Sequence, residues 1–586
     1  MIRTALLFAL AAAAAPAHAA PDLSTAAERS GFQHTGRYAE VQQLCARFQR
    51  AYPKAVRCFE FGRTPEGRPM LALAVSRTGA LTPARAKARG LPVLLVQGGI
   101  HAGEIDGKDA GFLALRQALD GQAAPGALDK QVLLFVPVFN VDGHERFGQW
   151  NRPNQRGPVA MGWRTTAQNY NLNRDYVKAD APEMRAMLAL VDAWDPLAYI
   201  DLHVTDGAKF QPDVSIQVEP VHGGDAELMR SGAALRDAVM ADLKRAGSDP
   251  KPFYISFAAN DDPQSGFEDG MAAPRFSTGY FPLRNRFAML VETHSWKDYP
   301  TRVGITRNTI VSLLSQVALH GREWQAQTRA ADLRAAALAG TAVPLSYQAT
   351  ARTTMIDFPG YAYTRTPSEV SGALMTHYDE STPQTWRVPL RDEVLPKLLA
   401  TAPRGGYLVP AALAERVAAR LRVHGVEFKL LARAPGAIDV ETFRAEQAKF
   451  GAQSFEGRQA LALQGEWKSE RREVGAGALF VPIAQARARL VVTLFEPRGA
   501  DSLLAWGEFN TAFERKEYME EYVAEDVARA QLAADPALAA AFQQKLAGDA
   551  AFAASPEARL EFFARRHSSW DERFNLYPVL RSAKAW

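Results

Sequence analysis

The stretch LPVLLVQGGIHAGE, residues 91–104, places a histidine and a glutamate directly after a continuous apolar run. A run that is apolar on both faces and ends in two glycines is typical of a buried central strand of an α/β sheet. Such sheets bind ligands at the carboxyl ends of their strands. His101 and Glu104 are therefore candidate metal ligands, although the H-x-x-E motif alone fits a simple ion pair at the start of a helix equally well.

Two other apolar runs end in ionisable side chains. His203 closes the run LAYIDLH, with Asp201 on the same strand face, and Glu292 directly follows AMLV. A carboxylate after four apolar residues is costly to bury unless it is paired or functional. Two alternatives stay open: His203 can be a core-edge histidine satisfied by Asp201, and His294 can be a structural or substrate-contacting group on the face of Glu292.

These side chains indicate the kind of metal site that is possible. The chain has only two cysteines, so it cannot form a four-thiolate zinc or iron–sulfur centre. Two histidines and one glutamate on zinc leave a fourth position for water, and a further glutamate can deprotonate that water. The pattern predicts a hydrolase whose metal ligands and base come from different strands.

Six motifs occur in an order that resembles the zinc carboxypeptidase family, the carboxypeptidase A-like metallopeptidases or funnelins. They are GRTPEGRP at 62–69, HAGE at 101–104, NVDG at 140–143, NLNRD at 171–175, DLH at 201–203 and VETH at 291–294. The resemblance covers roughly residues 35–325. It implies an α/β fold with a carboxypeptidase A-like mixed β-sheet flanked by helices.

The resemblance also implies a metal site. One zinc ion would be bound by His101, Glu104 and His203, and Glu292 would be the general base and later the proton shuttle. One position departs from the family pattern: Asn171 stands where members often carry an acidic residue that supports the first zinc histidine. This change removes no ligand.

Asn173 and Arg174 match the pair that, in the family, holds the terminal carboxylate of the substrate. The planar fork of an arginine suits a carboxylate because it can donate two parallel hydrogen bonds. The alternative for Arg174 is a surface ion pair with Asp175. The implied partner is a peptide or protein with a free C-terminal carboxylate.

The resemblance implies two further roles. The family uses an arginine to polarise the scissile carbonyl, and Arg152 is the candidate, with Arg146 and Arg156 as rivals. Tyr280, in STGY, is the candidate for the substrate-capping tyrosine, although it lies close to Glu292 in the sequence.

The length of 586 residues predicts more than one domain. We expect a catalytic domain at 20–335, a β-rich accessory domain at 342–510 and a helical C-terminal region at 511–586. Within the accessory domain, Arg489–Leu494 is among the segments expected to be strands.

The first residues have the composition of a secretory signal peptide. A short basic start, an apolar run and Ala17-His18-Ala19 predict cleavage after residue 19, with export to the periplasm or outside the cell. No other stretch is long and apolar enough to span a membrane. In an oxidising compartment Cys45 and Cys58 are expected to form one disulfide, the alternative being two buried free thiols.

The charge composition limits the classes of partner that the protein can bind. The net charge of +4 is too balanced to predict nucleic-acid binding. The favoured function is an exported zinc carboxypeptidase that releases C-terminal residues. The alternatives are an endopeptidase or amidase acting on cell-wall peptides, and a non-catalytic zinc-site binding or assembly module. The sequence leaves the oligomeric state open.

Overall fold

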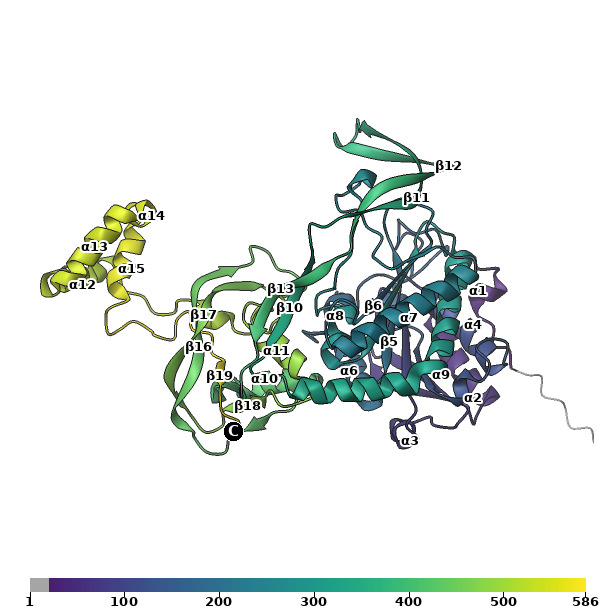
Figure 1. Cartoon of the computed structure of the whole chain (residues 1–586), viewed down its shortest axis with the longest axis horizontal. Helices are drawn as coiled ribbons and strands as arrows, with labels where there is room; N and C mark the ends of the chain where they lie inside the picture. The colour runs from purple at the N-terminus through teal and green to yellow at the C-terminus, as the bar shows by residue number, and fades with distance from the viewer. Residues whose placement is uncertain (1–20) are drawn as a thin grey trace, which may run out of the picture.

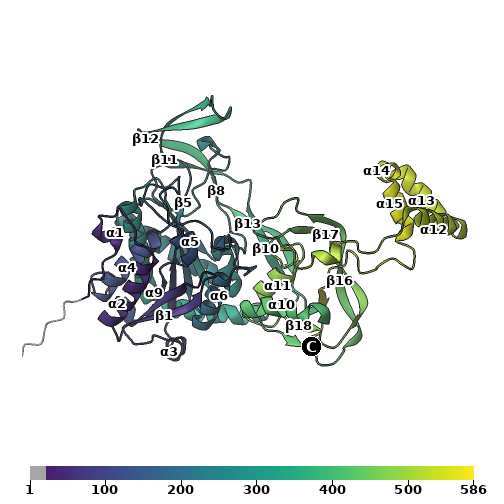
Figure 2. The same ribbon diagram turned by 180° about the vertical axis from the view of Figure 1, so that it is seen from behind.

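The structure, a computed structural model, describes residues 21–586. An α/β part contains the N-terminal half of the chain, and a β-rich part lies beside it, with a small helical bundle beyond (Figures 1 and 2). The predicted signal peptide lies outside the described residues. No helix among residues 21–586 is long and apolar enough to cross a membrane.

The α/β part is built on an eight-stranded mixed sheet of order β1-β2-β4-β3-β5-β9-β6-β7. The strands β3, β5 and β9 are neighbours and run parallel. The bounds are β1 Val56–Arg63, β2 Pro69–Val75, β3 Val93–Gly98, β4 Val132–Val136, β5 Ala198–Thr205, β6 Val214–Glu219, β7 Pro250–Lys251 and β9 Phe287–His294. The central strands are buried along their whole length, as their apolar runs require.

Helices flank this sheet. α4 and α7 each pack on α9, and α4 contacts β3 and β5 while α9 contacts β9. The bounds are α1 Ala26–Arg29, α2 Tyr38–Ala51, α3 Pro83–Ala88, α4 Asp106–Leu119, α5 Val141–Glu145, α6 Pro182–Trp194, α7 Ala226–Arg245, α8 Ser277–Tyr280 and α9 Tyr299–Ala336. The predicted fold class is thereby confirmed.

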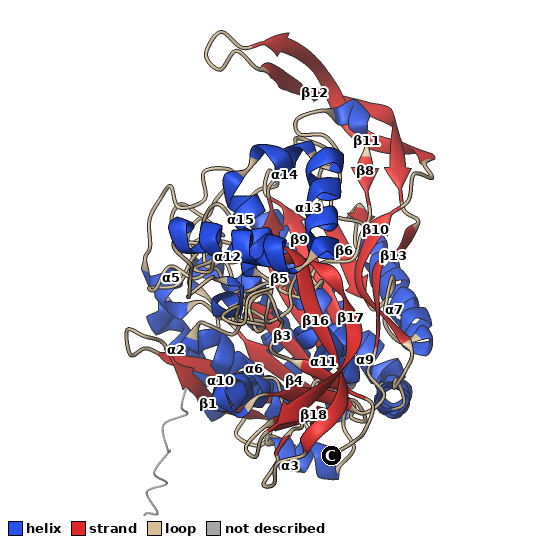
Figure 3. Cartoon of the chain, turned by 90° about the vertical axis from the view of Figure 1, so that its left-hand side faces the viewer, coloured by secondary structure: helices blue, strands red, loops and turns tan. Residues whose placement is uncertain are grey.

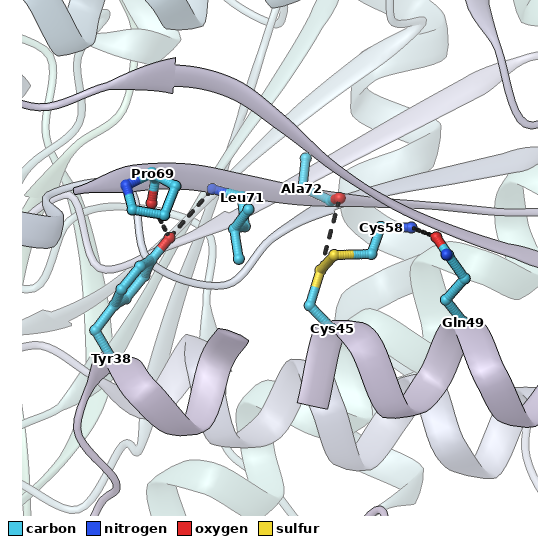
Figure 4. The surroundings of a disulfide bond; sticks show 7 residues. All are labelled: Tyr38, Cys45, Gln49, Cys58, Pro69, Leu71 and Ala72. Carbon is cyan, nitrogen blue, oxygen red and sulfur yellow. Dashed lines mark hydrogen bonds between the residues drawn. A yellow bond between two sulfur atoms is a disulfide. The ribbon is translucent and has the colours of Figure 1, made fainter. Parts of the chain in front are cut away.

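A disulfide joins Cys45 on α2 to Cys58 on β1, where Figure 4 shows the two elements side by side. The same helix is fastened to β2 by Tyr38, whose hydroxyl donates to the Pro69 carbonyl at 2.7 Å and accepts from the Leu71 N–H at 3.1 Å. Both links hold α2 against the edge of the sheet.

The C-terminal part contains three further sheets. In the first, β10 Ala342–Ala349 pairs with β13 Val394–Thr401. The second is a long hairpin of β11 Thr354–Pro367 and β12 Leu374–Arg391, in which β12 also pairs with β8 Phe267–Glu268 of the α/β part. The hairpin projects from the molecule in Figure 3. The third sheet has the order β15-β18-β14-β19-β16-β17, with bounds β14 Gly406–Val409, β15 Lys429–Leu430, β16 Gly436–Phe450, β17 Leu461–Val474, β18 Leu479–Pro482 and β19 Leu580–Ser582.

The helices of this part are α10 Ala411–Val423, α11 Ala488–Phe495, α12 Glu521–Ala534, α13 Pro536–Gly548, α14 Ala550–Ala554 and α15 Pro556–Ala564. The expected strand at Arg489–Leu494 is wrong, because these residues form α11. The region 511–586 is also not helical throughout: β19 returns to pair with β14 and β16. The other domain limits stay predictions.

Candidate metal centre and active-site cleft

The carboxyl ends of three neighbouring parallel strands bring the candidate ligands together. His101 and Glu104 follow β3, while His203 lies on β5 directly opposite Glu292 on β9. Because parallel strands end at the same edge of a sheet, residues that are almost 200 positions apart meet here. The apolar runs place these polar side chains by fixing where each strand ends.

The three candidate zinc ligands form one compact group. His101, Glu104 and His203 are all buried, and their ligand atoms lie within 4.8 Å of one another. Each imidazole points its Nδ1 at the Glu104 carboxylate, at 2.9 Å for His101 and 2.9 Å for His203. Two imidazoles and a carboxylate around one point are a donor set that suits zinc, so the residues fit the metal.

The outer nitrogen of each imidazole has its own polar neighbour. His101 Nε2 lies 3.2 Å from Asn171 Oδ1, and His203 Nε2 lies 3.0 Å from Asp201 Oδ1. Asp201 in turn accepts a hydrogen bond from Ser277 Oγ at 2.7 Å. Such contacts orient metal-binding histidines, here with Nδ1 turned towards the candidate metal position. The amide of Asn171 thus occupies the place of the family's acidic residue.

The backbone around the ligands is tightly held. A Cβ atom on Gly103 would lie 2.5 Å from Cγ of Arg152, so only glycine allows that arginine to cross the loop between His101 and Glu104. Directly after this loop, the buried Asp106 carboxylate accepts from Arg302 Nε at 2.9 Å and from Thr293 Oγ1 at 3.0 Å. These bonds tie the loop to the strand that carries Glu292.

The titration of the site reflects its burial. Burial raises the pKa of the Glu292 carboxyl to about 8, reinforced by Glu104 and opposed by the nearby His203. Burial also lowers the pKa of His101 to about 4 against the opposing influence of Glu104. Neutral His101 is the form that binds a metal.

These side chains line one cavity of about 550 Å³. Arg152 lies in it, with one Nη atom 3.0 Å from Glu104 and 3.3 Å from Asp206. Arg164, which the sequence did not suggest, lies 3.6 Å from Glu104 in the same cavity. Both guanidinium groups therefore face the candidate metal centre.

Asn173 and Arg174 line the same cavity. Arg174 stacks over the Phe276 ring at 4.2 Å and donates to the Asn173 carbonyl at 2.8 Å. It forms no ion pair with any residue of the described range 21–586. Asp175 instead pairs with Lys178 at 2.5 Å, which removes the alternative of an Arg174–Asp175 pair. A cation without an acidic partner is thus available to a ligand.

Tyr280 does not fit its predicted role as a capping tyrosine. Its side chain is fully buried outside the cavity, where its hydroxyl lies 2.9 Å from Nδ1 of His424 and accepts from Arg284 at 3.3 Å. Tyr254 lines the cavity instead, with its ring partly exposed and its hydroxyl accepting from Thr205 Oγ1 at 3.0 Å. The sequence carried no signal for it, because Tyr254 lies in an irregular loop.

The remaining alternatives lie away from the metal centre. Arg146 stacks on Trp163 at 4.2 Å, and Arg156 forms an ion pair with Glu380 of the β11–β12 hairpin at 2.9 Å. His294 is buried and stacks on Phe210, and burial lowers its pKa to about 3. Of the three candidate arginines, only Arg152 lines the cavity.

A His₂Glu group at the carboxyl edge of a mixed sheet, with a buried glutamate beside it, defines the class of metal-dependent hydrolases. Residues 41–214, less than a third of the chain, match the model of the zinc carboxypeptidase family. The match includes all three candidate zinc ligands and ends before Glu292. It confirms zinc as the metal and supports a zinc metallopeptidase.

Solved structures similar to the chain include three metallo-carboxypeptidases. One from Burkholderia cenocepacia has 18% identity and a TM-score of 0.34, covering 47% of this chain and 69% of its own. Carboxypeptidase A from Helicoverpa armigera has 16% identity and a TM-score of 0.35, with coverages of 50% and 74%. One from Pseudomonas aeruginosa has 17% identity and a TM-score of 0.35, with coverages of 48% and 69%. No curated protein matches the chain.

Proposed function

We propose that the chain is a zinc-dependent carboxypeptidase that releases the C-terminal residue of peptides. The observation that carries this proposal is the position of Arg174: a guanidinium without an acidic partner among residues 21–586 lines the same cavity as the three candidate ligands and Glu292. A fixed cation beside a metal centre selects a substrate carboxylate. An endopeptidase or amidase has no need of it, so the observation favours an exopeptidase. Export stays a prediction.

In the proposed reaction, Asn173 and Arg174 bind the terminal carboxylate and so set the distance of the last peptide bond from the metal centre. A zinc ion held by His101, Glu104 and His203 would supply Lewis-acid polarisation of a water molecule and of the scissile carbonyl.

Glu292 takes the proton from the attacking water and gives it to the amine that leaves. Arg152 donates to the carbonyl oxygen as negative charge develops on it. Tyr254, at the partly exposed side of the cavity, would contact the bound peptide.

Replacing the base tests this assignment. The variant Glu292→Gln should keep one zinc per chain and lose roughly 100- to 10,000-fold in kcat, because the amide has the shape of the carboxylate but cannot accept the proton. Zinc is measured by atomic absorption and kcat with an unblocked peptide.

The exposed Glu323 on α9 provides the matched control, since Glu323→Gln should leave both quantities unchanged. Full activity of Glu292→Gln would rule out Glu292 as the base. Loss of zinc in that variant would make it a ligand instead.

A further inference from the structure

A second cavity, of about 260 Å³, lies where the α/β part meets the C-terminal part. One wall comes from the loop that carries Met271 and Ala272, and the facing wall comes from β10 and α11. Figure 1 shows β10 and α11 on the side of the C-terminal part that faces the α/β part. Its volume is just below the range of ~300–1,000 Å³ that is usual for small-molecule pockets.

The walls of this second cavity are largely apolar and include Leu283, Leu338, Val343 and Leu345. The one acidic residue that lines it, Asp501, is already engaged: its carboxylate pairs with Arg275 Nε at 2.9 Å. The negative charge of Asp501 is therefore already neutralised by Arg275.

Arg489 also lines the cavity, and its charge is not neutralised. Its guanidinium makes no hydrogen bond and no ion pair with residues 21–586, and its Nη1 atom is shut off from solvent without a partner. Asp225 is the carboxylate whose charge acts on Arg489, but it is already bound by Arg334 at 2.7 and 2.8 Å. A largely buried guanidinium without a partner is unfavourable, and an anion at this point would satisfy it.

We propose that this cavity is a second ligand site, for a small aliphatic molecule with one carboxylate that pairs with Arg489. The apolar walls take the hydrocarbon chain, and the planar guanidinium takes the head group. Met271 and Ala272 line both this cavity and the candidate active site, so the two sites share a wall. The site is separate from the metal centre and does not depend on the proposed peptidase activity.

Calorimetric titration of the full chain with octanoate and with 1-octanol tests the proposal. Octanoate should bind with a 1:1 stoichiometry and about tenfold or more tightly than octanol, since the alcohol lacks the charge. Arg489→Met should remove this preference, whereas Arg489→Lys should keep part of it. Arg433→Met, at an exposed arginine without an ion pair in the described range, is the matched control and should bind like the wild type.

Octanoate could instead bind at Arg174 in the candidate active site, so Arg174→Met is titrated as well and should bind octanoate like the wild type. The proposal is overturned if the wild type does not bind octanoate, or if octanol binds equally well. It is also overturned if Arg174→Met rather than Arg489→Met abolishes binding. Should Arg489→Met fail to fold, the proposal is still tested by the preference of the wild type for octanoate over octanol and by the reduced preference expected of Arg489→Lys.

Discussion

At the scale of single residues, the neutral amide of Asn171 is the main departure from the family pattern. It contacts Nε2 of His101 at 3.2 Å, as an acidic side chain would, but adds no negative charge. The histidine is therefore oriented without being made more basic. The carboxylate of Asp201, in contrast, lies 3.0 Å from Nε2 of His203. One imidazole therefore has a neutral amide as its neighbour and the other has a negative charge.

The sequence suggested two kinds of site residue: those at the ends of buried strands, and Arg152, Asn173 and Arg174, which the family resemblance indicated and which lie outside the strands. His101, His203 and Glu292 follow apolar runs, whose length fixes where the side chains lie. Arg164 and Tyr254 lie in loops without periodicity, so only the folded chain brings them to the cavity. Tyr280 was chosen by its motif alone, and its helix turns it into the core.

His222 gives the folding stability a defined pH dependence. Its imidazole lies between Glu219, at 2.5 Å, and Asp269, at 3.2 Å. Burial alone would lower the pKa of His222, but the hydrogen bonds that its ring N–H groups donate to Asp269 and Glu219 raise it to about 10. Because the folded pKa exceeds the usual 6.5, this stabilisation is complete below pH 6.5 and is lost as the pH rises towards 10.

The variant His222→Gln should therefore be destabilised at pH 6, on the order of a few kcal/mol, and should approach the wild type at pH 10. Thermal unfolding at both pH values measures the difference. The exposed His377 is the matched control, and His377→Gln should follow the wild type at each pH. A difference that is the same at pH 6 and pH 10 would contradict the predicted pairing.

At the scale of elements, the β11–β12 hairpin supports the candidate active site. Its Phe358 and Trp386 pack in an aromatic cluster with Phe267 of β8 and Phe257. The next residue of β8, Glu268, lines the cavity, and the Asp269 N–H donates to the Arg391 carbonyl of β12 at 2.8 Å. One wall of the cavity thus rests on the accessory region.

Removing the buried indole should loosen that wall. Trp386→Ala should raise KM for peptides several-fold and lower the free energy of unfolding by about 3–5 kcal/mol, while zinc content stays unchanged. Steady-state kinetics, denaturant unfolding and metal analysis measure these effects. Arg387→Ala alters an exposed neighbour on the same strand and should change none of them. An unchanged KM in Trp386→Ala would show that the hairpin does not support the cavity.

Two elements show where sequence patterns fail. The buried run of α11 is apolar enough to resemble a strand, and a short apolar run does not distinguish the two. β19 has only three residues and pairs with strands about 140 and 170 positions earlier, so no local pattern identifies it. In contrast, the long runs of β3 and β4 between turn residues predicted strands that are present.

At the scale of the whole molecule, arginines of the C-terminal part form ion pairs with an aspartate of the α/β part. Arg420 and Arg458 both bind the Asp180 carboxylate, at 2.9 and 2.6 Å. Asp180 lies six residues after Arg174, in the segment that carries the proposed carboxylate-binding pair. The C-terminal part therefore fastens the chain on which the substrate's terminus is proposed to dock.

The central claim is that Arg174 selects a free C-terminal carboxylate beside a zinc centre. The most direct measurement compares one peptide as the free acid and as the C-terminal amide, with mass spectrometry of the products. The wild type should release one amino acid from the acid and leave the amide intact, and Arg174→Gln should lose most of this preference through a higher KM. Equal cleavage of the amide, or cleavage at internal bonds, would contradict it.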